Sequence, residues 1–302
     1  MTFTNVRGEV RLNEPMSGHT SFRIGGPADA LVTPADRQDL ITLLREVRAK
    51  GLAAVVIGSG TNLLVRDGGF RGVAISLKRL DAVEVAREYR SLGGSFAVIA
   101  AGAGAQLARV LNFAVERGLT GLEFAAGIPG TVGGAVCMNA CTAQGETGDV
   151  IESVTLLSPE GDMVTRRRDE MGFGYRTATV PPGHIVLDAR IILRHEDEAK
   201  IRANVKRLLD ERKERQPWGL PNAGSVFKNP LDEAAGKLIE SAGMKGATSG
   251  GAQVSEKHAN FIVNRGNATA ADVLALMDRV RKKVLEQHGV RLEPEITIIG
   301  ED

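Results

Sequence analysis

The tightest constraint on how this chain folds is a long tract without a charged side chain, FAAGIPGTVGGAVCMNAC, from Phe124 to Cys141. Its length would suit a membrane-spanning helix, but four glycines and a proline work against a helix exposed to lipid. Because glycine has no Cβ atom, such a backbone can approach a neighbouring group closely. The tract is therefore predicted to pack as backbone against something flat.

Composition sets the broad class and excludes some partners. A chain of 302 residues is long enough for two or three compact domains, and 43% hydrophobic with 25% charged residues is typical of a soluble protein. Lys and Arg number 38 against 37 Asp and Glu, which leaves a net charge of +1. No whole-molecule attraction to nucleic acid or to an anionic membrane follows from this charge, so any basic binding site must be local.

The N-terminus and the cysteines bear on location and metal binding. MTFTNVRGEV lacks the basic start and apolar core of a signal peptide, so a cytoplasmic location is expected. Cys137 and Cys141 lie four residues apart with no further cysteine and no nearby histidine. This spacing indicates neither a zinc site nor a disulfide scaffold. We expect two free, buried thiols and no metal.

Hydrophobic patterns in the first two thirds of the chain predict alternating strands and helices. ADALVT predicts a strand, and the helix after it would have Thr33 as N-cap and Gly51 at its end. The apolar run 52–58 is typical of a buried strand and leads into GSGTNLLV. A strand at 96–104, a helix at 105–118, a hairpin at 150–166 turning at 159–161 and a strand at 184–193 follow.

The hydrophobic pattern of the sequence changes after about residue 195, where long amphipathic helices are predicted. The pattern predicts helices at 201–217, 231–243 and 271–289, the last capped by Thr269, and strands at 258–264 and 292–300. A domain boundary is therefore expected near residues 195 to 203. Glu293 and Glu295 would share a face of the last strand, and one of them would be buried.

Two glycine-rich loops are candidate phosphate sites. GSGTN, at 58–62, follows a strand, but no helix is predicted after it, and GAGAQL, at 102–107, has Leu107 where a dinucleotide fingerprint needs its third glycine. Neither loop ends in the lysine and Ser/Thr pair of a Walker A motif. On pattern alone, GSGTN is equally a phosphate cradle or a plain tight turn.

The loop GLPNAGSVFKNP surrounds Ser225 with turn-forming residues, which predicts a sharply bent backbone and a fixed hydroxyl. A nucleophilic serine is disfavoured, because the chain has no Gly-x-Ser-x-Gly elbow and its histidines suggest no partner by spacing. Arg176, in MGFGYRTA, could hold a carboxylate or phosphate. The basic cluster of Arg212, Lys213 and Arg215 has a claim to an anionic ligand.

Seven blocks of sequence follow one another as SFRIGGPAD, IGSGTNLLVRDGGFRG, GLEFAAGIPGTVGGAVCMNA, FGYR, GLPNAGSVFKNP, AQVSEKHANFIVN and LEPEITIIG. In this order they resemble the UDP-N-acetylenolpyruvoylglucosamine reductase family, bacterial flavoenzymes that complete UDP-N-acetylmuramic acid for peptidoglycan. The resemblance extends from about residue 17 to about residue 300.

The resemblance implies an α+β fold. Residues 23–195 would form an FAD-binding region of the vanillyl-alcohol oxidase (PCMH) type, with lobes at 23–78 and 79–195, and residues 1–22 would pack on these lobes. Residues 196–302 would form an α+β domain that binds the UDP-sugar. The dinucleotide fingerprints would then be incomplete because this fold holds the FAD diphosphate in a different loop.

The resemblance also implies a non-covalently bound FAD. The loop 58–63 would hold the diphosphate, and the glycines of 127–134 would lie along the isoalloxazine ring, where backbone amides can reach it. No histidine occurs in GSGTNLLV, so a covalent flavin link is not expected there. The implied cofactor residues are Arg23, Gly58, Ser59, Gly60, Thr61, Asn62, Leu63, Gly127, Ile128, Pro129, Gly130, Thr131, Gly133, Gly134, Asn139 and Ile185.

By the same resemblance, Ser225, Arg176 and Glu295 are the catalytic residues. NADPH would reduce the flavin, and flavin N5 would then deliver hydride to the β-carbon of the enolpyruvyl group of UDP-N-acetylglucosamine enolpyruvate. Ser225 would protonate the α-carbon, while Arg176 would stabilise the charge that develops there. An ionised Glu295 would repel the substrate carboxylate, so we expect it to be protonated in the complex.

The resemblance further implies a set of substrate-binding residues, Arg212, Arg215, Lys228, Asn229 and His258. The chain lacks the tyrosine-bearing insertion that some members use to cover the substrate, so it resembles the shorter subtype. The implied setting is cytoplasmic cell-wall biogenesis, and through it cell shape and cell division, with small-molecule substrates and no obligate protein partner. Two rivals remain open: a flavin oxidase of the same fold, and an inactive protein that binds UDP-sugars.

Overall fold

The structure, a computed structural model, describes residues 2–302. It divides into two compact units. Unit 1 holds the chain up to Arg11, Leu31–Gly58 and Ala74–Glu211, and unit 2 holds Leu12–Ala30, Ser59–Val73 and Arg212–Asp302. Each unit thus draws on separate stretches of sequence. The domain boundaries expected near residues 22, 78 and 195 stay a prediction.

The main sheet of unit 1 has the strand order β12-β11-β13-β7-β6, and β8 pairs with β13. Its strands are antiparallel, and they are β6 (Val83–Ser91), β7 (Gly94–Gly102), β8 (Leu119–Thr120), β11 (Ile151–Leu157), β12 (Met163–Arg167) and β13 (Ile185–His195). The predicted hairpin is confirmed, because Leu157 pairs with Met163 across the turn. Sequence reasoning missed β6, a charged edge strand whose residues are all half-buried or exposed.

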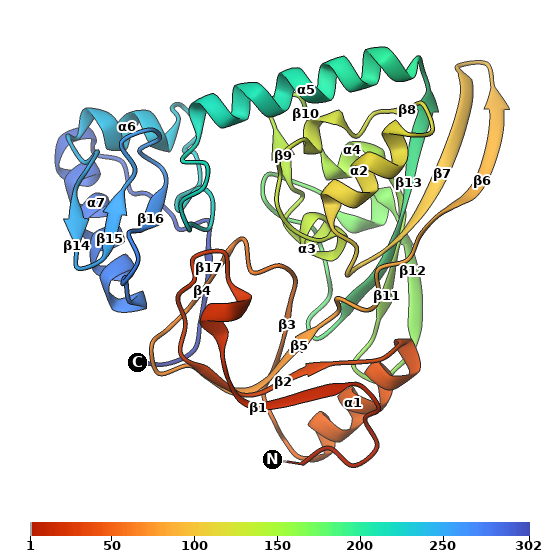
Figure 1. The fold of residues 1–302 in the computed structure, drawn as a ribbon, viewed down its shortest axis with the longest axis horizontal. Helices are drawn as coiled ribbons and strands as arrows, with labels where there is room; N and C mark the ends of the chain where they lie inside the picture. The colour runs from red at the N-terminus through yellow and green to blue at the C-terminus, as the bar shows by residue number, and fades with distance from the viewer. Residues whose placement is uncertain (1) are drawn as a thin grey trace. The chain divides into compact units, whose positions relative to one another are not determined.

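Short helices lie on one side of this sheet (Figure 1): α2 (Leu107–Val115), α3 (Val132–Cys137) and α4 (Thr147–Val150). The β13 residues Ala189, Ile191 and Leu193 are buried. Two small strands, β9 (Cys141–Thr142) and β10 (Gly145–Glu146), pair with each other near the short helix η2 (Glu123–Ala125). A further short helix, η3 (Arg168–Met171), follows β12.

The uncharged glycine tract contains helix α3, with the Thr131 hydroxyl accepting a hydrogen bond from the Gly134 amide at its N-terminus. Close backbone approach is confirmed here, against the chain itself. The Gly133 amide donates to the Ala103 carbonyl at 2.9 Å, and a Cβ atom on Gly133 would lie only 3.0 Å from the Cβ of Ala103. Glycine is therefore needed where the tract meets the loop after β7.

A second sheet has the order β1-β2-β5-β3, with strands β1 (Glu9–Pro15), β2 (Pro27–Thr33), β5 (Phe70–Ser76) and β3 (Ala54–Ile57). Helix α1 (Arg37–Ala49) connects β2 to β3, as the sequence predicts. The predicted N-cap was wrong. Thr33 is buried as the last residue of β2, and the Asp36 carboxylate caps the helix by accepting a hydrogen bond from the Asp39 amide.

The burial predicted for the run 52–58 was also wrong. Strand β3 lies at the edge of its sheet, Ala54 is exposed and Val56 is 38% exposed. Edge strands are covered on fewer sides than central ones. An apolar run therefore does not by itself indicate a buried strand.

Unit 2 is built around helices α6 (Ala235–Ser241) and α7 (Ala270–His288). Its strands are β14 (Thr248–Ser249), β15 (Ala252–Val254) and β16 (Ile262–Asn264) in one sheet, and β4 (Leu63–Val65) paired in parallel with β17 (Thr297–Ile299); the short helix η1 is Met16–His19. Both α6 and β16 are shorter than predicted. Phe22, Leu64, Phe227 and Leu276 belong to its fully buried core.

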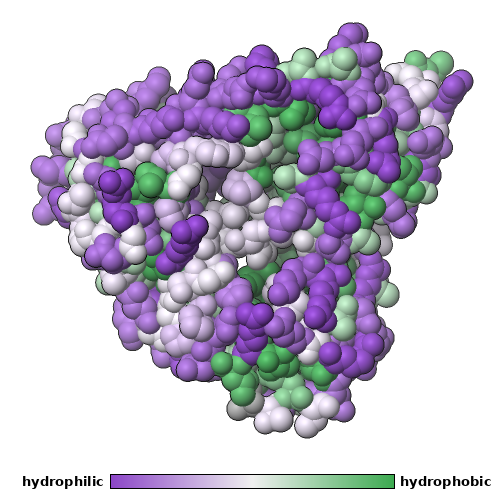
Figure 2. All heavy atoms as spheres, viewed as in Figure 1, coloured by the Kyte–Doolittle hydropathy of each residue, from purple (hydrophilic) through white to green (hydrophobic). Residues whose placement is uncertain are grey.

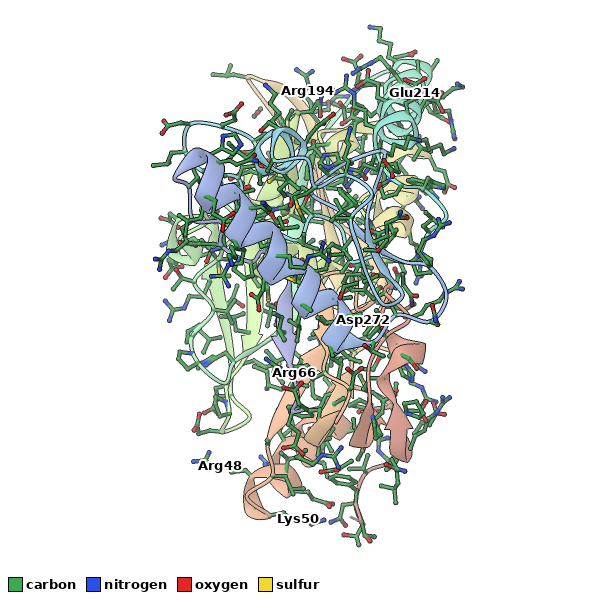
Figure 3. All side chains as sticks on the ribbon, turned by 90° about the vertical axis from the view of Figure 1, so that its left-hand side faces the viewer. Arg48, Lys50, Arg66, Arg194, Glu214 and Asp272 are labelled. Atoms are coloured by element: carbon green, nitrogen blue, oxygen red, sulfur yellow. The ribbon has the colours of Figure 1, made fainter. Side chains whose placement is uncertain are left out.

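The predicted cap of α7 is confirmed. Thr269 and Asp272 form a capping box at its start, where Figure 3 shows Asp272. Asp67 adds a second cap, because its carboxylate accepts hydrogen bonds from the amides of Ala270 and Ala271 at 2.8 and 2.9 Å. Free amides at a helix start gain most from such acceptors.

Helix α5 (Glu198–Arg215) is the amphipathic helix that the sequence predicts. Ile201 and Leu208 are buried, and ion pairs such as Arg207–Glu211 link residues one turn apart on the exposed face. Figure 2 shows a mostly hydrophilic surface along this helix, interrupted by some apolar atoms. The mixture of helices and antiparallel strands confirms the predicted α+β class.

Residues 2–302 lack two features. No helix in this range is long and apolar enough to cross a membrane. The same residues contain no cluster of three or more His, Cys, Asp or Glu side chains arranged to hold a metal ion.

Candidate active site

Ser225 lies in unit 2, at the end of the turn-rich loop. The Asn222 side chain accepts a hydrogen bond from the Gly224 amide at 2.9 Å, and Gly224 has a φ of +76°. The Asn222 carbonyl accepts a hydrogen bond from the Ser21 hydroxyl at 2.6 Å. Ser225 itself pairs with Phe261 in an isolated bridge. The predicted sharp bend is thus confirmed and the backbone of Ser225 is held, while the fixed direction of its hydroxyl stays a prediction.

A buried asparagine holds the segment after Ser225. The Asn260 side chain is 2% exposed, accepts a hydrogen bond from the Phe227 amide at 3.1 Å and donates one to the Phe227 carbonyl at 2.8 Å. The Asn260 carbonyl also accepts from the Val226 amide at 2.9 Å. Val226 and Phe227 are buried, so this segment has little freedom to move. Sequence reasoning missed Asn260, although an asparagine within the apolar run HANFIV was a visible signal.

Glu295 lies beside the same segment. Its amide donates to the Val226 carbonyl at 2.9 Å, and its side chain is buried. The predicted shared strand was wrong, since β17 begins only at Thr297. Glu293 is exposed and forms an ion pair with Lys228 at 3.5 Å. One of the two glutamates is buried, as expected, and it is Glu295.

The loop after Gly58 lies in unit 2 from Ser59 onward and approaches this segment. The Asn62 side chain donates to the Glu295 carbonyl at 3.1 Å, and the Asn62 carbonyl accepts from the Thr297 amide. Gly60 has a φ of +62°, and a Cβ atom there would overlap the His19 carbonyl oxygen. Within unit 2, the structure therefore brings Asn62 close to Glu295 and Ser225.

Other predicted residues of unit 2 lie around this loop. Arg23 is exposed, has a φ of +55° and donates its amide hydrogen to the Thr20 carbonyl, while the Ser21 amide donates to the Gly60 carbonyl. Leu63 begins β4 and is buried. Arg23 and the predicted diphosphate loop are thus joined through residues 20 and 21.

In unit 1 the structure brings Gly58 next to the glycine tract. A Cβ atom on Gly58 would lie 2.7 Å from the Thr131 hydroxyl, and Gly134 has only this hydroxyl nearby. Gly127 and Gly130 have φ of +72° and +134°. Backbone amides can line a surface here without side chains in the way. Three other predicted cofactor residues belong to unit 1. Ile128 is half-buried and Pro129 is exposed in the turn before α3, and Ile185 is buried at the start of β13.

Arg176 occupies a tight turn of unit 1 in which Gly174 and Thr177 exchange backbone hydrogen bonds. Its φ of +57° lies in the left-handed region, which is strained for a residue with a side chain. Fully buried Asn139 braces this turn, because its side chain donates to the Gly174 carbonyl at 3.0 Å and accepts from the Gly148 amide at 2.8 Å. Asn139, which was predicted as a flavin neighbour, thus holds the turn that carries Arg176.

The predicted substrate residues have varied surroundings. The Arg212 side chain donates to the Gln216 side chain at 2.9 Å, Asn229 accepts from the Ala235 amide, and Arg215 is exposed. His258 Nδ1 accepts a hydrogen bond from the Asn260 amide at 3.2 Å, which leaves the proton of the neutral ring on Nε2. Burial lowers the pKa of His258 and favours this neutral form.

The histidines have partners other than Ser225. His19 contacts Glu14, His184 the Pro182 carbonyl, His195 Glu88, His258 Asn260 and His288 Ser241. Among residues 2–302 the Ser225 hydroxyl makes no hydrogen bond. A nucleophilic serine needs an adjacent base, so this arrangement does not support a hydrolase.

Both cysteines are free, as expected, but Cys137 is exposed and Cys141 half-buried. The prediction of buried thiols was wrong for Cys137. Neighbouring protein atoms nevertheless desolvate its thiol and raise its pKa.

Comparisons with known proteins agree with this arrangement. Residues 216–299 match the C-terminal domain of UDP-N-acetylenolpyruvoylglucosamine reductase, and residues 28–166 match an FAD binding domain family. The chain is 46% identical over 297 residues to the UDP-N-acetylenolpyruvoylglucosamine reductase of Geobacter metallireducens, covering 98% of this chain and 96% of the relative. The chain belongs to the UDP-N-acetylenolpyruvoylglucosamine reductase family.

Other members give the same result. The reductase of Moorella thermoacetica is 46% identical over 298 residues, which is 99% of this chain and 96% of that protein. The crystal structure of the UDP-N-acetylenolpyruvylglucosamine reductase of Thermus caldophilus superposes with a TM-score of 0.81 at 36% identity, covering 97% of this chain and 98% of that one. The predicted family, its FAD cofactor and its reductase class are therefore confirmed.

Proposed function

We propose that this protein reduces the enolpyruvyl group of UDP-N-acetylglucosamine enolpyruvate with electrons from NADPH, giving UDP-N-acetylmuramate for peptidoglycan. The observation that carries the proposal is the adjacency of the Ser225 and Glu295 segments, joined by the Glu295 amide and the Val226 carbonyl at 2.9 Å. A proton donor and a buried carboxyl are thereby supplied by neighbouring backbone segments. The family to which the chain belongs supplies the reaction class.

The glycine positions fit a flavin. Cβ atoms at Gly58 and Gly60 would strike Thr131 and His19, so the backbone at both positions stays bare. We assign the diphosphate to residues 58–63, with Arg23 beside them, and the ring to residues 127–134, Asn139 and Ile185. The flavin, when bound, supplies two-electron transfer from NADPH to the substrate. In this assignment residues 23–195 serve the cofactor and residues 196–302 the substrate.

Ser225 donates the proton that the substrate α-carbon takes up. A serine hydroxyl is a weak acid, but an enediolate is a strong base, so position matters more than acidity. The backbone around Ser225 is fixed by Asn222 and Asn260, while its hydroxyl makes no hydrogen bond within residues 2–302. This combination holds the backbone of Ser225 in place and leaves its hydroxyl hydrogen free to turn toward the substrate.

Arg176 and Glu295 act on the substrate carboxylate. The Arg176 guanidinium stabilises negative charge as it develops, which is where a positioned charge lowers the barrier most. Its strained turn, braced by Asn139, serves this positioning. Glu295 acts as a neutral hydrogen-bond donor, because a second ionised carboxylate there would repel the substrate.

The nucleotide-sugar is held by basic and polar side chains of the C-terminal segment, namely Arg212, Arg215, Lys228, Asn229 and His258. The neutral His258 ring carries its proton on Nε2 and can donate a hydrogen bond from there to the nucleotide-sugar. The protein works in the cytoplasm, where it supports cell-wall growth and division with small-molecule substrates and no obligate protein partner.

An anaerobic two-step experiment tests the proposal. The flavin of the purified holoenzyme is reduced with NADPH, UDP-N-acetylglucosamine enolpyruvate is added, and flavin reoxidation is followed by absorbance. Substrate-dependent reoxidation is expected. Reoxidation by oxygen alone would favour a flavin oxidase, and failure of NADPH to bleach the flavin would favour an inactive binding protein.

The Ser225→Ala variant tests the proton donor. We expect normal flavin reduction by NADPH and a reoxidation rate about 100- to 10,000-fold lower, the usual contribution of a positioned acid. Ser241→Ala removes an exposed serine of the same unit and is the matched control. Equal loss in both half-reactions of Ser225→Ala would contradict the assigned role.

A further inference from the structure

The tryptophan of this chain is unusually open to solvent. Trp218 is the one tryptophan in the sequence and is 53% exposed, although large aromatic side chains are usually mostly covered. It lies just after α5, and the neighbouring Leu220 is 38% exposed. Tryptophan is enriched among the residues that contribute most to binding, so an open tryptophan is a candidate contact for a ligand.

The backbone of Trp218 is held without covering its ring. The Trp218 amide donates to the Gln216 carbonyl at 2.8 Å, and the Gln216 amide donates to the Arg212 carbonyl, so the turn continues from the end of α5. Gly219 follows with a φ of +86° and no atom near its missing Cβ. The ring is therefore presented from a short, hydrogen-bonded turn.

One cation lies over this ring, and a second is bonded to the backbone of the residue that carries it. The Lys213 ammonium lies 5.8 Å from the ring centroid, and the Lys257 ammonium donates to the Lys213 carbonyl at 2.6 Å. Within the described residues 2–302, no carboxylate forms an ion pair with Lys213, Arg215 or Lys257, although Glu214 lies on the same turn of α5 (Figure 3). Their positive charge is thus available to an anion beside the aromatic face.

An open aromatic face beside uncompensated cations suits a nucleotide, whose base stacks and whose phosphates are neutralised. The same loop leads within seven residues to Ser225, and Asn222 between them is tied to Ser21. A ligand with its reacting group at Ser225 would therefore extend its other end along this loop. Both candidate ligands, the UDP-sugar and NADPH, carry a base and a diphosphate.

We infer that Trp218 is the platform on which the uracil base of the UDP-sugar stacks, with Lys213 and Lys257 beside the diphosphate. This inference rests on the proposed function and extends it, because it supplies a cover for the nucleotide end in a chain without the tyrosine insertion. Uracil is chosen over the adenine of NADPH because Trp218 lies in the segment that matches the family's C-terminal domain, to which the proposed function assigns the UDP-sugar.

Intrinsic fluorescence tests the inference directly, since Trp218 is the one tryptophan. The holoenzyme is titrated with UDP and, separately, with adenosine 2′,5′-bisphosphate. We expect UDP to quench the tryptophan emission saturably and the adenosine compound to leave it unchanged. Quenching by the adenosine compound alone, or by neither, overturns the inference. Trp218→Phe provides the background emission.

Kinetics give an independent readout. Trp218→Ala should raise the KM for the UDP-sugar roughly ten- to hundredfold, the range for losing one base–aromatic stack, with little change in the rate of flavin reduction by NADPH. Trp218→Phe should restore most of the affinity, and Leu285→Ala, which removes a 45% exposed leucine of α7, should leave KM unchanged. An unchanged KM in Trp218→Ala, with a wild-type enzyme that turns over, refutes the stacking role alone. A wild-type enzyme that does not turn over refutes the proposed function instead.

Discussion

Removing the Asn260 side chain should weaken both the fold of unit 2 and proton delivery by Ser225. Asn260 is 2% exposed, and its amide forms two hydrogen bonds with the backbone of Phe227, at 3.1 and 2.8 Å. Phe227 is fully buried, so water cannot replace these bonds. In Asn260→Ala the Phe227 amide and carbonyl are both left without partners.

The size of the effect follows from those two groups. An unsatisfied buried polar group costs about 1–3 kcal/mol, so two of them lower the free energy of unfolding by about 2–6 kcal/mol. Ser225 lies two residues before Phe227, so the same change frees the serine to move. A misplacement of about 1 Å can cost on the order of 100-fold in rate. We therefore expect slower flavin reoxidation by the UDP-sugar and unchanged flavin reduction by NADPH.

Stopped-flow absorbance measures the two half-reactions, and thermal unfolding followed by circular dichroism measures stability. Asn264→Ala is the matched control. Asn264 is also buried and its side chain donates to the Phe22 carbonyl and accepts from the Gly266 and Ala268 amides, but none of these contacts touches the Ser225 segment. Equal slowing of reoxidation in the two variants would mean that Asn260 acts through general stability, and the positioning argument would be refuted.

Three further outcomes are expected. Gly60→Ala should weaken FAD binding to the apoprotein in a fluorescence titration, because its Cβ would overlap the His19 carbonyl oxygen, while Gly18→Ala, with no atom within 4 Å, should not. Since neighbouring protein atoms desolvate the Cys137 thiol and raise its pKa, its alkylation rate should still increase above pH 9.0, and a plateau below that pH would count against this. Burial lowers the pKa of His258, so the unfolded chain binds the proton first and stability should be lost as pH falls below 6.5. His258→Gln should lose less stability between pH 7.5 and 5.5 than the wild type, as measured by thermal unfolding.

Local signals predicted the parts of the fold that local interactions decide. The start of α7 was found from Thr269 because a capping box is complete within four residues. The β11–β12 hairpin was found from its turn because proline and glycine fix the backbone there. In both cases the stabilising contacts lie within a few residues of the signal.

Predictions that depended on distant neighbours did less well. The run 52–58 carries no signal that β3 lies at the edge of its sheet. That position depends on pairing with strand β5, which comes later in the chain. Thr33 and Asp36 are both suitable N-cap residues. Asp36 caps the helix because Thr33 is the last residue of strand β2. For the same reason the clamp of Asn260 on Phe227, 33 residues apart, was invisible to sequence patterns.

The two interpretations that the sequence left open for Ser225, a turn residue and a proton donor, turn out to be compatible. The turn fixes the backbone through Asn222 and Gly224, and the serine side chain takes no part in it. A nucleophile would need a base in contact, and that contact would fix the hydroxyl hydrogen toward the base. A proton donor needs the opposite, a fixed oxygen whose hydrogen is free to point at the substrate. The contacts around Ser225 hold its backbone and leave its hydroxyl hydrogen free, so the turn is compatible with the proton-donor role that we propose.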